Sequence, residues 1–274
     1  MHFGNLEEKC LHYRGLTDYK ILPNSNVIAM VDGRAFSRLV KKRFALPFDD
    51  NFIHMMNETA KYVCENVQGC KIAYVQSDEI SFLITDYDTP ESDSFFGYRL
   101  CKMQSIIASL ATAKFNQMFM KLAFTHGEET VITDAQAVID SVPLAQFDCK
   151  VWAVPSGNDA FAWFLYRQID CTRNSKQQAA QTYVPHKELV GKNVDEQLKL
   201  LKEKAGIDWE TDYSDGKKYG RFVYQELHHM SKVINGNLIE FDRNAWTAHD
   251  AFPLTGEDGK EKFYGLVPVL TIKL

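Results

Sequence analysis

The sequence lacks several patterns that would assign it directly to a class. None of its six cysteines forms a C-x-x-C pair, and its eight histidines show no spacing typical of metal ligands, which disfavours a zinc site or a disulfide framework. No apolar run approaches the roughly 18 to 20 residues that span a bilayer, and the N-terminal stretch MHFGNLEEKCLHYRG contains no apolar secretory segment. We therefore expect a cytoplasmic protein that does not enter a membrane.

An excess of positive charge is also missing. The net charge is −5, which taken alone speaks against a nucleic-acid-binding protein. The cations are unevenly distributed, however: residues 33–48 carry five Lys or Arg and no acid, and residues 95–124 carry four and no acid. Such runs can attract a polyanion even on an acidic protein. A solvated basic face is the alternative for either run.

The patterns that are present indicate an α/β (α+β) chain with enough apolar material, 45% of 274 residues, for a sizeable core. Because the order begins strand, helix, hairpin and does not alternate as in a doubly wound fold, we expect a mixed sheet with flanking helices. The predicted strands are 27–33, 147–154 and two runs within 70–86, and the predicted helices are 51–67, 95–124 and Ser156 to about Tyr183.

The C-terminal part supplies further turn and cap signals. Asn193 followed by Glu196 predicts a capping box for a helix that ends at Gly206, and residues 207–221 are typical of a loop. An Asn-Gly pair within residues 232–241 predicts a hairpin. The stretch LVPVLTIKL, residues 266–274, predicts a last strand.

Three carboxylates stand out at the ends of the predicted strands. Asp32 ends the first strand, and Asp78 with Glu79 interrupts the apolar hairpin. A strand-helix-strand connection would crowd these acids together, which is unfavourable unless a cation neutralises them. Oxygen ligands without His or Cys favour Mg²⁺, whose remaining ligands would be waters and substrate phosphates, as in two-metal nucleotidyl transfer. The alternative is a turn residue, Asp32, and a solvated hairpin tip.

Cations follow the acids in the sequence. Arg34 and the basic residues 38–43 come directly after Asp32, and Arg99 and Lys102 lie three positions apart on one helix face. With Ser77 as a hydroxyl donor, this set suits a nucleoside triphosphate and its metal. Ordinary surface charge is the alternative reading.

A polar stripe is predicted on the helix that follows Ser156. Arg167, Asp170, Arg173 (or Asn174) and Gln177 fall on one face of that helix. Such a stripe could bind an RNA backbone or a triphosphate, or could bridge to a partner subunit. The residues alone do not separate these outcomes.

Together these segments resemble a known family. DGRAFSRL after a strand, then QSDEISF, then an arginine and a lysine three apart, and later FDCKVWAVPS and RQIDCTRNS…HKEL are similar to the tRNA(His) guanylyltransferase superfamily of 3′–5′ polymerases, over roughly residues 5–235. The resemblance implies a polymerase-palm-like catalytic core over 1–155 and a helix and hairpin region over 156–274 packed on that core. It also implies a homotetramer.

The resemblance further implies site residues and substrates. Two Mg²⁺ ions would be held by Asp32 and Asp78 with help from the Gly33 carbonyl, and Glu79 would stand beside them as a third catalytic carboxylate. The substrates would be ATP or GTP and the 5′ end and acceptor stem of tRNA. The implied nucleotide-binding residues are Gly33, Arg34, Phe36, Lys41, Asp49, Asp50, Ser77, Arg99 and Lys102, and the implied RNA-binding residues are Arg167, Arg173, Asn174, Ser175, His186 and Lys187.

The implied reaction adds a nucleotide to the 5′ end of tRNA. The 5′ end is activated with ATP or already carries a triphosphate; the 3′-hydroxyl of an incoming nucleotide then attacks it, and pyrophosphate leaves. Two departures from the eukaryotic pattern matter: Thr172 stands where HINNLYNT-type motifs have histidine, and Met30 stands where arginine is common. The Arg-Asn-Ser version resembles bacterial and archaeal-type proteins, which favour templated repair of 5′-truncated tRNA.

Several alternatives stay open. The first is non-templated addition of G to tRNA(His). A palm-type nucleotide cyclase is a second, although the sequence has no Gly-Gly-Asp-Glu-Phe-type turn. The third is a non-catalytic RNA-binding module, for which three crowded acids would have no use.

Overall fold

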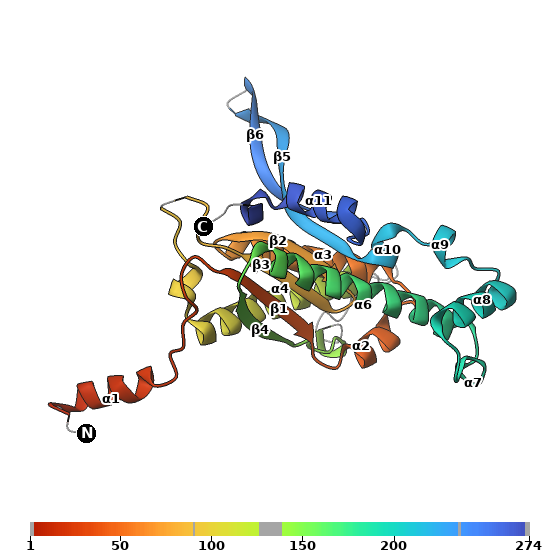
Figure 1. The fold of residues 1–274 in the computed structure, drawn as a ribbon, viewed down its shortest axis with the longest axis horizontal. Helices are drawn as coiled ribbons and strands as arrows, with labels where there is room; N and C mark the ends of the chain where they lie inside the picture. Colours follow the sequence, from red (N-terminus) through yellow and green to blue (C-terminus); the bar gives the residue numbers. More distant parts are fainter. Residues whose placement is uncertain (1–2, 90, 126–138, 235–236, 272–274) are drawn as a thin grey trace.

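The computed structural model describes residues 3–89, 91–125, 139–234 and 237–271. At its centre is a six-stranded sheet with the strand order β4–β1–β3–β2–β5–β6 (Figure 1), and the expected α/β fold class is confirmed. The strands are β1 (Asn26–Gly33), β2 (Cys70–Gln76), β3 (Glu79–Ile84), β4 (Phe147–Val154), β5 (Arg221–Ile234) and β6 (Asn237–Asp250).

The expectation of a mixed sheet is corrected by the strand pairing. Every pairing between the described strands is antiparallel. β1 and β2 do run in the same direction, as their helical connection requires, but β3 folds back from β2 and lies between them. The first four strands therefore form a ferredoxin-like β-α-β-β-α-β unit, and β5 extends the same sheet from the region 156–274.

Helices cover both faces of this sheet (Figure 1). Side chains alternate along β1: Val27, Ala29 and Val31 pack with α3 and α4, whereas Ile28 packs with α6 and α11. Asp32 follows the spacing of Ile28 and so belongs to the α6 face. The covering helices are α3 (Asp50–Asn66), α4 (Leu100–Thr125), α6 (Gly157–Tyr183) and α11 (Gly256–Leu266).

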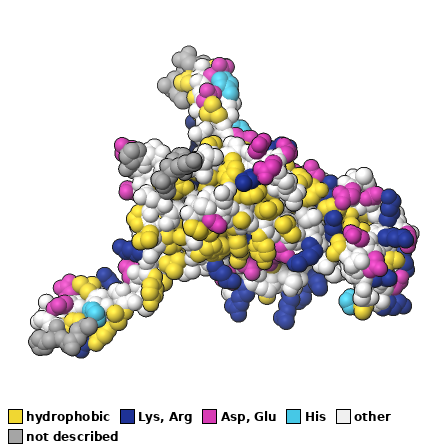
Figure 2. All heavy atoms as spheres, viewed as in Figure 1, with side chains coloured by type: hydrophobic (Ala, Val, Ile, Leu, Met, Phe, Trp, Pro, Cys, Tyr) yellow, Lys and Arg dark blue, Asp and Glu magenta, His cyan; other side chains and the backbone are white. Residues whose placement is uncertain are grey.

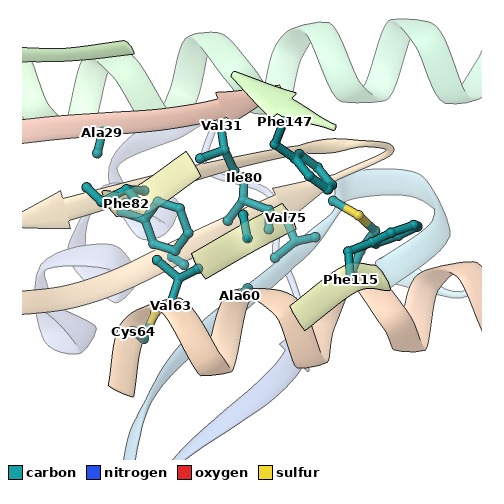
Figure 3. Packing of buried hydrophobic residues seen from close by; sticks show 14 of the residues in the cluster. Ala29, Val31, Ala60, Val63, Cys64, Val75, Ile80, Phe82, Phe115 and Phe147 are labelled. Atoms are coloured by element: carbon teal, nitrogen blue, oxygen red, sulfur yellow. The ribbon is translucent and has the colours of Figure 1, made fainter. Parts of the chain in front are cut away.

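Aromatic side chains fill the core between the sheet and α4. The ring of Phe115 lies 5.1 Å from that of Phe36 and 5.5 Å from that of Phe147, and Phe52 and Phe119 complete the group. Figure 3 shows Phe115 and Phe147 facing one another beside the strand residues of this cluster. This packing joins Phe36, shortly after β1, and Phe147, at the start of β4, to the covering helices α3 and α4.

Most predicted helix limits are confirmed by their caps. Asp49 caps α3, Ser156 caps α6, and Asn193 and Glu196 form a capping box for α8 (Val194–Ala205), which Gly206 ends in the left-handed region. The helix predicted over 95–124 starts later, because the turn η1 (Phe95–Tyr98) holds residues with positive φ. Three further helices are α1 (Leu6–Gly15), α2 (Phe36–Arg43) and α7 (His186–Leu189).

Two predictions for the C-terminal part are wrong. The expected loop 207–221 contains α9 (Trp209–Asp212) and α10 (Asp215–Tyr219), because the buried Trp209 packs on the neighbouring helices. The expected last strand is instead the end of α11 and the turn η2 (Pro268–Thr271). Its apolar side chains pack on the start of α6, and Pro268 has no N–H for a sheet ladder; residues 272–274 lie outside the described part.

Two elements project from the body (Figure 1). α1 has no buried residue. β5 and β6 pair from Arg221 and Asp250 to Ile234 and Asn237, which agrees with the predicted hairpin, although the Asn235-Gly236 turn lies outside the described residues. In the part of the chain that is described, no helix combines the length and apolarity needed to cross a bilayer.

The aromatic group predicts a large stability effect. We expect Phe115→Ala to lower the free energy of unfolding by about 3–5 kcal/mol, because it removes a fully buried ring from between four others. Urea unfolding measures this value. Phe241→Ala, on the projecting hairpin at 39% exposure, is the matched control and should cost less than about 1 kcal/mol; equal costs for the two would contradict this account of the core.

Candidate active site

The predicted carboxylates meet in one row across the sheet. Asp32 on β1 pairs with Glu79 on β3 on one side and with Asp148 on β4 on the other. Asp78 occupies the turn next to them, and its carbonyl accepts a hydrogen bond from the Gly33 N–H at 3.2 Å. The strand order thus brings Asp32, Asp78 and Glu79 to the same end of the sheet.

The turn that carries Asp78 is strained. Ser77 and Asp78 alone connect β2 to β3, and Ser77 has φ of 44°, in the left-handed region. A non-glycine residue held in this region costs on the order of 1–3 kcal/mol. The Ser77 hydroxyl donates to Asp78 Oδ1 at 3.0 Å, so the tight turn fixes both the backbone and the side chain of Asp78.

Glu79 is neutralised by an arginine of α6. Arg167 donates from Nε and Nη2 to the two carboxylate oxygens of Glu79, at 2.7 and 2.6 Å, and both side chains are 13% exposed. One helical turn earlier, Trp163 Nε1 donates to Ser81 Oγ at 3.1 Å. Glu79 and Ser81 of β3 thus contact Arg167 and Trp163, which lie one turn apart on α6. The contact with Arg167 explains why the carboxylate of Glu79 is tolerated in an apolar strand.

This pairing bears on two expectations. We expected a metal to neutralise all three acids, but a bidentate guanidinium already satisfies Glu79. We expected Arg167 to contact RNA, but its guanidinium is held by Glu79 and, at 3.3 Å, by Asp170. Arg167 therefore lies within the site as a fixed partner of Glu79.

Asp32 and Asp78 have no such partner. In the described ranges neither carboxylate forms an ion pair with Lys, Arg or His. Burial raises the pKa of Asp32, and repulsion from Asp148 raises it further. Burial likewise raises the pKa of Asp78, and the charge of Asp32 adds to the shift. The two acids therefore form a locally unbalanced negative site.

This donor set fits a hard divalent cation only with help from substrate. No group of three or more His, Cys, Asp or Glu side chains in the described segments is arranged to hold a metal alone. Mg²⁺, however, is commonly bound by one or two carboxylates together with waters and substrate phosphates. Two unpaired carboxylates beside the Gly33 backbone match that requirement.

A cleft opens in front of these acids. It has a volume of about 220 Å³, with an apolar wall from the α2–α3 segment that includes Pro47, Phe48 and Phe52. A second opening, of about 340 Å³, shares Asp32, Ser77 and Asp78 with the first and is lined also by Gly33, Phe36 and Lys41. The cleft thus offers an apolar surface next to a polar end.

Asp49 lines this cleft, and Asp50 follows it as the first residue of α3. Asp49 accepts hydrogen bonds from the N–H groups of Ala45, Asn51 and Phe52 at 2.9 to 3.0 Å. Its carboxylate therefore shapes the loop that carries the apolar wall. Asp50 pairs with Lys217 at 2.7 Å.

Three predicted nucleotide-binding residues are not brought to the cleft. Arg34, just before α2, donates to Gln146 Oε1 at 3.0 Å and lies in a separate groove with cations of α2. Arg99 pairs with Asp18 at 2.8 Å, and the Lys102 ammonium lies 4.4 Å from the centre of the Phe96 ring. α4 begins near the start of β1, so Arg99 and Lys102 occupy the opposite end of the sheet from Asp32.

The predicted RNA-binding residues are divided among different surroundings. Asn174 and Ser175 line the cleft, but Ser175 is only 5% exposed and is held by Trp209 Nε1 and the Lys217 carbonyl. Arg173 is exposed and pairs with Asp170. His186 and Lys187 are exposed on α7.

Sequence reasoning missed other residues of the site. Asp148 faces Asp32 from β4, and Gln178, Lys217 and Arg221 line the cleft. Asp148 follows the buried Phe147 in the strand FDCKVWAV and so points to the opposite face of the sheet. This alternation is the sequence signal that Asp148 faces the same side as Asp32. The contribution of Arg221 depends on strand pairing that no local pattern reveals.

The sheet and its acids together define a class. A ferredoxin-like antiparallel sheet that carries carboxylates at the end of its first strand and in the adjacent hairpin is a palm-like domain, of the kind used for two-metal nucleotidyl transfer. The chain belongs to the tRNA(His) guanylyltransferase family, whose model matches residues 8–155.

Named relatives agree with this assignment. The tRNA(His) guanylyltransferase of Neurospora crassa is 30% identical over 156 residues, 57% of this chain and 48% of the relative. The probable tRNA(His) guanylyltransferase of Mus musculus is 28% identical over 155 residues, 56% of this chain and 46% of the relative. The matches thus span about half the length of these curated relatives.

Solved structures extend the likeness to nearly the whole chain. A bacterial tRNA(His) guanylyltransferase-like protein in complex with ATP is 28% identical, with a TM-score of 0.78 over 96% of this chain and 99% of that one. A bacterial tRNA(His) guanylyltransferase-like protein in complex with GTP is also 28% identical, with a TM-score of 0.72 over 96% of this chain and 98% of that one. The region 156–274 is therefore part of a fold that these structures share.

The Glu79–Arg167 pair predicts a pH-dependent defect. Burial raises the pKa of Glu79 even with Arg167 present, and Arg167→Met removes the partner that opposes this shift. We expect a loss of about 3 kcal/mol in unfolding free energy at neutral pH and above. The loss should shrink as the pH falls towards 4.5, the ordinary pKa of glutamate, because the folded variant then takes up a proton at Glu79.

Urea unfolding of the variant across this pH range measures the effect. Adding Glu79→Gln to Arg167→Met is the control, because without the carboxyl group the pH dependence of the defect should vanish. A defect of the same size at every pH would show that Arg167 acts through packing alone.

Proposed function

We propose that this chain is a 3′–5′ nucleotidyltransferase that adds nucleotides to the 5′ end of tRNA. The observation that carries the proposal is a pair of carboxylates, Asp32 and Asp78, that form no ion pair within the described ranges and line a cleft in a chain of this family. The names of the relatives support tRNA as the acceptor. The ATP and GTP complexes of the bacterial relative support nucleoside triphosphates as substrates.

Each part of the cleft has a role in this proposal. Two Mg²⁺ ions held by Asp32, Asp78 and the Gly33 carbonyl would neutralise phosphate charge and activate the attacking hydroxyl. The Ser77 hydroxyl is placed to donate to a phosphate oxygen once Asp78 is otherwise engaged, and Lys41 adds a cation at the second opening. The apolar wall at Phe48 and Phe52 provides a surface for a nucleobase.

We further propose that the preferred reaction is Watson–Crick-templated repair of 5′-truncated tRNA. Thr172 stands where eukaryotic members have histidine, and its hydroxyl donates to the Gln168 carbonyl of its own helix at 2.8 Å. This position therefore offers no free donor for reading a particular base. In templated repair the opposing tRNA strand supplies that selection, so a protein contact of this kind is not required.

The exposed cations of α2 and α7 are the proposed contacts for the tRNA backbone. Arg34, Arg38, Lys42 and Arg43 line a groove of about 430 Å³ beside the site, and Lys and Arg side chains extend from the lower edge of the body in Figure 2, where α2 lies in Figure 1. Phosphate contacts of this type position an RNA without reading its sequence.

The assembly and location of the protein are also proposals. We propose a cytoplasmic homotetramer in which residues 1–155 provide the catalytic core. The projecting α1 and β5–β6 hairpin are the surfaces that other subunits would cover. Their exposed apolar side chains include Leu6, Tyr13, Leu16, Leu227, Val233 and Leu238.

The two carboxylates give a direct test of catalysis. We expect Asp32→Ala or Asp78→Ala to reduce nucleotide addition by more than about a hundredfold, with the fold intact by circular dichroism, because each removes a proposed metal ligand. Incorporation of a labelled nucleotide measures the activity. Asp258→Ala on α11, an exposed carboxylate, is the control. Full activity of either cleft variant with Mg²⁺ would refute the two-metal assignment.

The choice of reaction is tested with a tRNA that lacks its first 5′ nucleotide, supplied with each labelled triphosphate in turn. Addition of the base complementary to the unpaired 3′ partner, changing when that partner is changed, is the expected result. Indifference to the partner, with G always added to intact tRNA(His), would instead assign the non-templated reaction. No extension of either RNA would favour the RNA-binding module.

A further inference from the structure

Arg221 is a buried cation in the wall of the cleft. It is the first residue of β5, is 6% exposed, and lines the same cavity as Asp32 and Asp78. Its strand lies beyond β2 in the sheet, on the side away from β1. The acids and Arg221 therefore belong to different parts of the cleft lining.

The guanidinium donates hydrogen bonds to two neutral groups. Its Nε donates to Asn57 Oδ1 and its Nη1 to the Gly216 carbonyl, both at 3.2 Å. An arginine has five N–H donors, so two of them fix the group and the others remain. In the described ranges Arg221 forms no ion pair with Asp or Glu, whereas Arg167, in the same cleft, forms two.

Such an arrangement is costly in the absence of an anion. Burial lowers the pKa of Arg221, because removal of a charge from water destabilises it. The charge of Asp250, its cross-strand neighbour on β6, opposes this shift but forms no ion pair with it in the described ranges. A phosphate oxygen would compensate this charge with a bidentate, charge-assisted pair. The other two cations of this lining are already paired, Arg167 with Glu79 and Asp170 and Lys217 with Asp50 at 2.7 Å. Arg221 is therefore the lining cation that forms no ion pair among the described residues.

We propose that Arg221 binds a phosphate group of the substrate in the cleft, on the side opposite the carboxylates. The identity of the molecule that carries the phosphate rests on the proposed function: it is either the incoming nucleoside triphosphate or the 5′ phosphate of the RNA. The phosphate-binding role of Arg221 itself does not depend on catalysis.

The first experiment measures binding without metal. Tripolyphosphate and a 5′-phosphorylated RNA oligonucleotide are each titrated, in the presence of a chelator, into the wild type, Arg221→Gln and Arg221→Lys. We expect Arg221→Gln to weaken at least one of the two by at least tenfold and Arg221→Lys to recover part of that loss. Arg243→Gln, which removes an exposed arginine of β6, is the control for tripolyphosphate.

A second variant separates binding from folding. Asn57→Asp replaces the amide group that Arg221 Nε already contacts with a carboxylate. The new carboxylate is an internal counter-ion for Arg221. We expect this variant to unfold at a higher temperature than the wild type when no ligand is present, and to bind phosphate several-fold more weakly. A purely structural Arg221 would leave the phosphate affinity of Asn57→Asp unchanged.

The outcomes assign or overturn the inference. A loss confined to tripolyphosphate assigns the nucleotide, and a loss confined to the phosphorylated RNA assigns the acceptor. Unchanged affinity for both ligands in Arg221→Gln and in Asn57→Asp would overturn the inference while leaving the proposed function intact. Conversely, wild-type protein that binds phosphate through Arg221 but never extends a tRNA would refute the proposed function alone.

Discussion

The Glu79–Arg167 ion pair is the contact on which the arrangement of the site depends. It ties α6 to the sheet at the row that contains Asp32, and the neighbouring contact of Trp163 with Ser81 keeps the helix aligned with β3. Because this pair neutralises Glu79, the acids next to it that line the cleft without an ion pair in the described residues are Asp32 and Asp78. The helix thus determines which of the crowded acids remain available for a cation.

The same end of the sheet concentrates features that oppose folding. Ser77 is held in the left-handed region, burial raises the pKa of both Asp32 and Asp78, and Arg221 is buried without an ion pair among the described residues. A single substitution at each of these positions would remove the unfavourable conformation or charge. Their presence together beside one cleft, above a well-packed aromatic core, is typical of a site at which stability is given up for binding.

Local sequence patterns predicted the strands, turns and helix caps that depend mainly on neighbouring residues. The strand that ends at Asp32, the hairpin around Asp78 and the caps at Ser156 and Asn193 all follow from periodicity and capping chemistry. Long-range pairing was not accessible in this way. The insertion of β3 between β1 and β2, the approach of Asp148 and Arg221, and the placement of Arg99 at the far end of the sheet depend on topology.

The β5–β6 hairpin also connects two parts of the molecule. β5 is 14 residues long, about 45 Å of extended chain, and it begins in the wall of the cleft and ends well outside the body (Figure 1). Its first residues, Arg221 to Val223, pair with β2, and the strand then continues outward paired with β6. The residue that lines the cleft and the exposed outer half of the hairpin therefore lie on one continuous strand.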